Sequence, residues 1–228
     1  TAVGTGLANY AIAYQNGSLT IGKADAVIVV NGYTGVYDAS PHGATGTATG
    51  VESPTPANLT SLLHLGDSFT DVPGGTAHWT FDGDGNYNPA SGDAAIVISK
   101  ATATIVVTPY DVIYDATAHT AAGTATGVKG ESLAGLDLSG TTRVHAGTTV
   151  DPWTFSDVTG NYHNASGTVL DRIAQAALTI TATTNSKVYD ATTTAAATPT
   201  VSGLQGTDTV TGLVEAYTDP NAGTGKTL

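Results

Sequence analysis

The chain has 228 residues, a formal net charge of −12 and 28 Gly, and it contains neither Cys nor Met. The negative charge repels phosphate backbones and anionic membrane surfaces, and no apolar run reaches the roughly 18 to 20 residues that cross a membrane, so we expect neither a nucleic-acid partner nor membrane insertion. The absence of Cys excludes disulfides, thiolate nucleophiles and cysteine-based metal centres, and it suits an oxidising, extracellular location.

Residues 1–22 are expected to be the C-terminal strands of an incomplete repeat. They contain the pair Asn9-Tyr10, followed by the stretch 16–21. The same Asn-Tyr pair recurs near the end of two longer segments further along the chain, which is why residues 1–22 are assigned to the end of a repeat.

Residues 23–99 are expected to form a first immunoglobulin-like repeat. Short strands are predicted over residues 26–30, 44–51, 59–65, 77–81 and 94–98, with 36–37 as an edge segment. Between 77 and 81, alternation with a period of two sends Trp79 and Phe81 to one face. We interpret Trp79 and its equivalent Trp153 as core residues, with a carbohydrate-stacking platform as the alternative.

Residues 100–174 are expected to form a second repeat, because five landmarks of the first return in the same order. For example, the run 37–39 (Tyr-Asp-Ala) returns as 114–116, and Asn86-Tyr87 returns as Asn161-Tyr162. Residues 175–228 are expected to be the N-terminal part of an incomplete third repeat, which has its own Tyr-Asp-Ala run at 189–191 but no Asn-Tyr pair.

The two incomplete ends have two interpretations. A longer array could have been cut at a loop, which would leave frayed ends. Alternatively, residues 1–22 of one molecule could complete residues 175–228 of a neighbouring molecule by strand addition to an open sheet edge. Because such a head-to-tail contact does not close, it would build a filament.

Six or seven short strands in about 77 residues predict an all-β fold of tandem small antiparallel immunoglobulin-like β-sandwiches. Sandwiches of this kind often carry a Tyr whose hydroxyl bonds back to the chain, and Tyr10, Tyr87 and Tyr162 are the candidates. The repeats follow each other with almost no linker, which predicts a stiff rod.

Several of these segments resemble known bacterial repeats. Residues 36–39 with Pro41-His42, and residues 85–92, look like MBG-type bacterial immunoglobulin-like repeats, while residues 187–193 and 221–226 resemble the related YDG-type repeats. The resemblance implies a β-sandwich in large secreted adhesins, a bacterial cell-surface or extracellular location, and a spacer or adhesion role without an active site. Many members carry Gly after the Tyr-Asp pair, where this chain has Ala39, Ala116 and Ala191.

Candidate sites are few, and we expect no catalytic residue and no cofactor. Asp82, Asp84 and Asn86 alternate as in a calcium loop, but Tyr87 stands where such a loop needs Gly, so an ordinary turn is favoured over calcium. Glu52 and Glu131 are interpreted as parts of surface turns. A covalent crosslink between an Asn and either Lys23 or Lys100, which start their repeats, is a further hypothesis.

The expected function is therefore non-enzymatic: a structural spacer or adhesive module of a bacterial cell-surface or extracellular protein, able to polymerise head-to-tail. The alternative is a module that binds a glycan or another cell-surface protein. Its contacts would come from the loops where the repeats diverge most, residues 52–58 and 129–136.

Overall fold

The computed structural model describes all residues from Thr1 to Leu228 and confirms the prediction of an all-β protein. Apart from the strands, it contains only three 3₁₀ helices of one turn each, η1 Leu7–Asn9, η2 Thr60–Leu62 and η3 Ser139–Thr141. The strands are β1 Val27–Asn31, β2 Tyr33–Val36, β3 Thr45–Thr49, β4 Leu63–His64, β5 Gly74–Phe81, β6 Ala90–Ser99, β7 Thr104–Thr108, β8 Asp111–Ile113, β9 Ala122–Thr126, β10 Leu136–Asp137, β11 Gly147–Phe155, β12 Ala165–Ala174, β13 Thr179–Thr181 and β14 Thr200–Ser202. None of the helices is long and apolar enough to span a membrane.

The chain divides into two compact units. The first unit contains residues 1–35 and 40–98, and the second contains residues 36–39 and 99–228. The chain therefore passes from one unit to the other at three points, because residues 36–39 belong to the second unit although both flanking segments belong to the first.

The first unit contains a two-stranded and a four-stranded sheet. Strands β1 and β3 pair in antiparallel register, and the second sheet has the order β2-β6-β5-β4. Inward and outward positions alternate along β6, as period-two geometry requires. Phe81 and Tyr87 are buried at the centre of the core, while Trp79 packs against it but stays partly exposed. The predicted shared face of Trp79 and Phe81 is thus confirmed.

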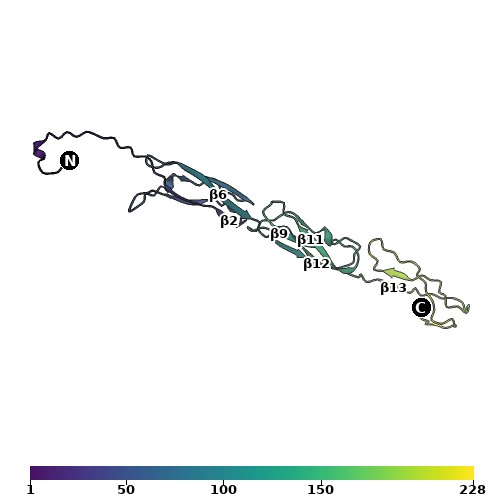
Figure 1. Cartoon of the computed structure of the whole chain (residues 1–228). Coiled ribbons are helices and arrows are strands. Elements are labelled where there is room, and N and C mark those ends of the chain that lie inside the picture. Colours follow the sequence, from purple (N-terminus) through teal and green to yellow (C-terminus); the bar gives the residue numbers. More distant parts are fainter. The chain divides into compact units, whose positions relative to one another are not determined.

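The second unit repeats this arrangement with β7–β9 and with a sheet of order β10-β11-β12-β8 (Figure 1). The β7–β9 register is that of β1–β3 moved 77 positions along the chain, since Val27 pairs with Thr49 and Thr104 pairs with Thr126. Strand β8 runs parallel to β12. The core of this arrangement centres on Phe155 and Tyr162. We call corresponding residues of the two arrangements counterparts.

Residues 175–228, called here the C-terminal segment, belong to the second unit but contain few strands. Strands β13 and β14 pair as β1 and β3 do, with Thr179 opposite Ser202. No strand of this segment is a counterpart of β6 or β12. Its residues are mostly exposed, with Glu215 as the buried exception.

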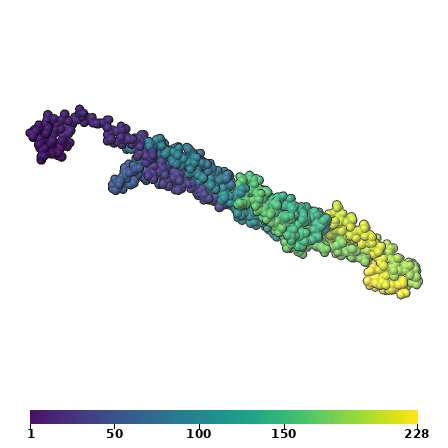
Figure 2. Space-filling model, in the orientation of Figure 1, coloured from purple at the N-terminus to yellow at the C-terminus, as the bar shows by residue number.

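Residues 1–22 form no strand, and apart from Leu7 their side chains are exposed. Figure 2 shows these residues in purple as a small knot of atoms followed by a thin trail. Because no sheet surrounds Tyr10, its side chain is solvent-exposed, unlike those of Tyr87 and Tyr162.

Candidate functional site

In the first unit, a buried tyrosine closes the loop that follows β3. The Tyr87 hydroxyl donates a hydrogen bond to Glu52 Oε1 and accepts one from the Val51 N–H at 3.1 Å. The hydrogen bond to Glu52 raises the pKa of Tyr87. The Ala57 N–H, and then the Tyr87 hydroxyl, lower the pKa of Glu52. The prediction that this hydroxyl bonds back to the chain is confirmed.

The second unit builds the same site around Tyr162. Its hydroxyl donates to Glu131 Oε1 and accepts from the Val128 N–H at 3.0 Å. Burial, followed by the hydrogen bond to Glu131, raises the pKa of Tyr162 to about 12. The Tyr162 hydroxyl in turn lowers the pKa of Glu131. Each unit thus holds a neutral phenol against an ionised carboxylate.

The sequence did not identify the carboxylates of Glu52 and Glu131 as the hydrogen-bond partners of the two tyrosines. Glu52 follows Gly50 by two positions whereas Glu131 follows Gly127 by four, so an alignment of the repeats does not superimpose them. The available signal was the glycine itself. A Cβ at Gly50 or Gly127 would collide with the tyrosine hydroxyl, so both positions require Gly for the close approach of the phenol.

The tyrosine-bearing loop is also held to the start of each unit. In the first unit, the Ala24 N–H donates to the Asn86 carbonyl at 2.8 Å, and the Ala24 carbonyl accepts from the Asn88 N–H at 2.8 Å. Ala101 makes the equivalent bridge to Tyr162. We call the surroundings of each tyrosine its socket: the backbone bridge from this Ala, the Gly that follows the preceding strand, and the N–H of the Val after that Gly, which binds the phenol.

The two lysines considered for a crosslink form hydrogen bonds to the loops that carry the tyrosines. Lys23 Nζ donates to the carbonyl oxygen of Asp84 at 2.7 Å, and Lys100 Nζ donates to that of Tyr162 at 3.2 Å. Both amines therefore bind backbone oxygens of the tyrosine-bearing loops.

The calcium candidates take separate roles in the same loop. Asp84 Oδ1 accepts from the N–H groups of Asn86 and Tyr87 at 2.7 and 2.9 Å, which makes it the anchor of a turn. Asp82 Oδ2 lies 2.9 Å from His64 Nε2. No group of three or more His, Asp or Glu side chains is placed to hold a metal ion.

The C-terminal segment has the socket without the tyrosine. Gly203 follows β14 as Gly50 follows β3, and Ala176 precedes β13 as Ala24 precedes β1. Beside Ala176 and Gly203 lies a cavity of about 380 Å³, which is also lined by Leu204 and Gln205 and, from outside the segment, by Tyr114 and Ala146.

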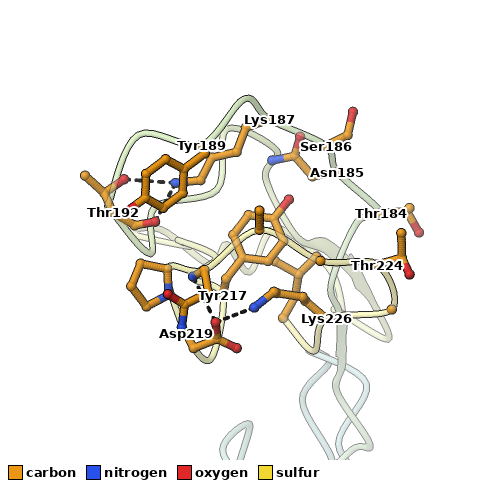
Figure 3. Close-up of a pocket in the computed structure, with 16 residues that line it drawn as sticks. Thr184, Asn185, Ser186, Lys187, Tyr189, Thr192, Tyr217, Asp219, Thr224 and Lys226 are labelled. Carbon is orange, nitrogen blue, oxygen red and sulfur yellow. Dashed lines mark hydrogen bonds and ion pairs between the residues drawn. The ribbon is translucent and has the colours of Figure 1, made fainter.

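A second cavity of about 460 Å³ lies in the same segment (Figure 3). The rings of Tyr189 and Tyr217 line it, and Lys187 Nζ lies 5.7 Å from the centre of the Tyr217 ring. Lys187 also pairs with Asp190 at 2.8 Å and holds the pKa of that carboxyl at about 2. Lys226 pairs with Asp219 and lowers its pKa. The charges of this cavity are therefore mutually neutralised.

A buried acidic cluster in the second unit was also missed. Asp151 and Asp171 are each 1% exposed, and Arg143 forms an ion pair with Asp151. Asp171 Oδ1 accepts from the Tyr110 N–H at 3.1 Å, but Asp171 Oδ2 has no partner. Burial, and then the charge of Asp151, raise the pKa of Asp171.

The first unit shows that this acidic cluster is not needed for the fold. The counterparts of Asp151 and Asp171 there are the buried apolar residues Ala77 and Ile96, as the pairing of Trp79 with Gly92 and of Trp153 with Gly167 shows. Because a strand pattern only separates inward from outward positions, it assigned these two Asp to no site.

The comparisons with known proteins correct the expected family. Residues 174–228 match the model of the YDG domain, and no curated protein matches the chain. The match is to a YDG domain and does not extend to the residues on which the MBG resemblance was based, so the assignment to MBG-type repeats of bacterial adhesins is wrong. The comparisons support neither a bacterial adhesin nor an MBG domain nor an array of tandem repeats.

There is a physical reason for the mistaken assignment. The landmarks that suggested it have local structural roles: the Asn-Tyr pair supplies the phenol of the socket, and the Tyr-Asp-Ala run forms a tight turn. Any small β-domain can use such elements, so they indicate local geometry and not family.

Proposed function

We propose that the chain is a non-enzymatic spacer of an extracellular protein, in which successive small immunoglobulin-like sandwiches form a stiff rod. The observation that carries this proposal is that the chain enters the second unit at residues 36–39, returns to the first unit for residues 40–98, and then enters the second unit again. Three chain crossings restrict bending more than the single crossing of an ordinary linker does. The absence of Cys and Met suits an oxidising exterior.

Residues 36–39 are fixed inside the second unit by several contacts. The Tyr37 ring lies edge-on to the Tyr162 ring at 5.5 Å, and the Tyr37 N–H donates to the Ser99 carbonyl at 2.8 Å. Lys129 Nζ donates to the carbonyl oxygen of Ala39. The connection between β6 and β7 is also short, because β6 ends at Ser99 and β7 begins at Thr104. Both features support a stiff junction.

Distance measurements between spin labels test this stiffness. The chain has no Cys, so Val27→Cys and Val150→Cys introduce two unique labelling sites at exposed positions, one in each unit. We expect one narrow distance distribution, and we expect Tyr37→Ala to broaden it. Tyr33→Ala is the matched control, since Tyr33 stacks on His42 within the first unit. A parent distribution already as broad as that of Tyr37→Ala would contradict the proposal.

Ligand binding is the second candidate function. The observation that favours it is the cavity of about 460 Å³ with two tyrosine rings, because aromatic faces and polar groups together suit a sugar or a peptide. Binding of the labelled chain to a glycan array, lost in Tyr217→Ala, would favour this function over a purely mechanical one.

A further inference from the structure

Residues 1–22 expose side chains of the kind that the two units bury. Tyr10, Leu19 and Ile21 are 74%, 85% and 86% exposed. With Tyr10 aligned to Tyr87, Leu19 and Ile21 fall on Ile96 and Ile98, which are fully buried in β6. Aligned to the second unit, Ile21 falls on Ile173, which is buried in β12. The stretch is therefore patterned as a core strand that has no core around it.

Residues 1–22 also carry no Asp, Glu, Lys or Arg, although the whole chain has a net charge of −12. A strand without charges can enter a protein interior without the cost of desolvating an ion. The segment also adds nothing to the repulsion between copies of this acidic chain.

The C-terminal segment offers a place for Tyr10. Its empty socket keeps the elements that hold Tyr87: Ala176 in place of Ala24, Gly203 in place of Gly50, and the Leu204 N–H in place of that of Val51. The Gln205 side-chain oxygen can accept the phenol hydrogen bond, as Glu52 does in the first unit. The cavity of about 380 Å³ is the space that the ring would fill.

The same segment offers a place for Ile21. In the second unit, β8 pairs with residues 172–174 of β12. The counterparts of β8 in the C-terminal segment are residues 186–188, which form no strand and partly line the cavity of about 460 Å³. In the same segment, Asn185 Nδ2 and Glu215 Oε2 are buried without any hydrogen-bond partner. This edge therefore lacks the strand that β12 supplies elsewhere.

We propose that residues 8–22 of one molecule bind the C-terminal segment of a second copy, with Tyr10 in the cavity at Gly203 and residues 20–22 paired to residues 186–188. This binding site goes beyond the spacer role and does not depend on it. The donor, residues 8–22, and the acceptor, the C-terminal segment, lie on different surfaces of the chain. The contact is therefore head-to-tail and adds copies without closing.

Sedimentation of the full chain over a range of concentrations tests the proposal. We expect the parent chain to form oligomers that grow with concentration, and Ile21→Asp to weaken association at least about tenfold. Thr20→Asp is the matched control, because Thr20 is the counterpart of the exposed Val97 and Arg172 and would face solvent. A parent chain that stays monomeric at every concentration would overturn the proposal, as would equal effects of both variants.

Mixing two defective variants tests the direction of the contact. Ile21→Asp has a faulty donor and an intact acceptor, whereas Ala176→Phe has an intact donor and a socket filled by its own ring. We expect each variant alone to be monomeric and an equal mixture to give a heterodimer that grows no further. Failure of two folded variants to pair would overturn the proposal, and if Ala176→Phe does not fold, as circular dichroism would show, the comparison of Ile21→Asp with Thr20→Asp decides.

Discussion

At the scale of single residues, the phenols of Tyr87 and Tyr162 connect three levels of the structure. Each is buried in a core, bonded to a backbone N–H and bonded to a carboxylate. Hydrogen bonds to ionised groups are about twice as strong as those between neutral groups. We therefore expect the hydroxyl groups to contribute to stability beyond the packing of their rings.

Tyr162→Phe should lower the free energy of unfolding by about 1 to 3 kcal/mol, because the Val128 N–H and the Glu131 carboxylate both lose a partner. Urea unfolding at neutral pH measures this. Tyr10→Phe should leave the stability of the monomer unchanged, since Tyr10 is exposed.

The effect of Tyr162→Phe should also depend on pH. The pKa of Tyr162 is about 12 in the folded chain against about 10 when unfolded, so its contribution is complete below pH 10 and is lost as the pH rises through 12. Melting curves from pH 8 to 12 should show the parent chain approaching the variant. A constant difference over this range would contradict the assignment.

Asp171 has the opposite effect at neutral pH. Its pKa is raised above its usual value, so its protonated form is favoured by folding, and its contribution is complete below pH 3.8 and is lost as the pH rises through the folded-state pKa. Asp171→Asn keeps an acceptor for the Tyr110 N–H and removes a buried charge. We expect it to stabilise the second unit by about 1 to 3 kcal/mol at pH 7.

The pH dependence of that difference is the check. Chemical unfolding of parent and variant should differ most at neutral pH, and the two curves should converge as the pH falls below 4. Asp111→Asn is the control, because Asp111 is an exposed carboxylate that pairs with Arg172 on the surface. A variant less stable than the parent at pH 7 would show that the Asp171 carboxylate is well compensated.

At the scale of elements, the three Tyr-Asp-Ala turns share an unusual backbone. Ala39, Ala116 and Ala191 all have positive φ, of 57°, 62° and 58°. Alanine in this left-handed region costs roughly 1 to 2 kcal/mol relative to the right-handed one. The turns are held by the preceding Asp, as Asp115 Oδ1 accepts from the Thr117 N–H at 2.9 Å. The structure thus shows Ala in the conformation that usually selects Gly.

Ala116→Gly should therefore stabilise the second unit by about 0.5 to 1 kcal/mol, since relief of the left-handed strain exceeds the extra entropy that Gly loses on folding. Thermal unfolding measures the gain. Ala125→Gly, in the buried part of β9, is the matched control and should destabilise. Equal losses for both variants would mean that the turn is not strained.

The sequence predicted strands well where side chains alternate and poorly where local hydrogen bonds decide. Residues 26–30 and 77–81 were expected as strands and largely coincide with β1 and β5. Residues 59–65 were also expected as a strand, but they begin with η2, because Asn58 Oδ1 accepts from the Thr60 N–H and starts a turn. That bond depends on the shape of the loop and leaves no periodic trace.

The sites were predicted less fully than the strands. The phenols were found because Asn-Tyr recurs, whereas their carboxylate partners lie at different offsets in the two units. Asp151 and Asp171 were missed because only the folded sheet brings β11 and β12 side by side. The sequence did not predict that residues 36–39 belong to the second unit, because this depends on contacts with residues far away along the chain.

At the scale of the whole molecule, burial predicts where a protease cuts first. Chymotrypsin should cleave after Tyr10 and Tyr14, which are exposed and lie outside any strand, well before it cleaves after Tyr87 or Tyr162. Mass spectrometry of early digestion products checks this order. In oligomers joined as proposed above, Tyr10 should become protected, whereas first cleavage at Tyr87 would contradict the fold of the first unit.

The passage of residues 36–39 through the second unit also affects how the molecule comes apart. If heat melts the first unit, the chain on both sides of Tyr37 loses its anchor, and the ring that lies against Tyr162 is released with it. Unfolding of the first unit thereby destabilises the second. Calorimetry should therefore show residues 23–174 melting in one shared transition and not in two independent ones.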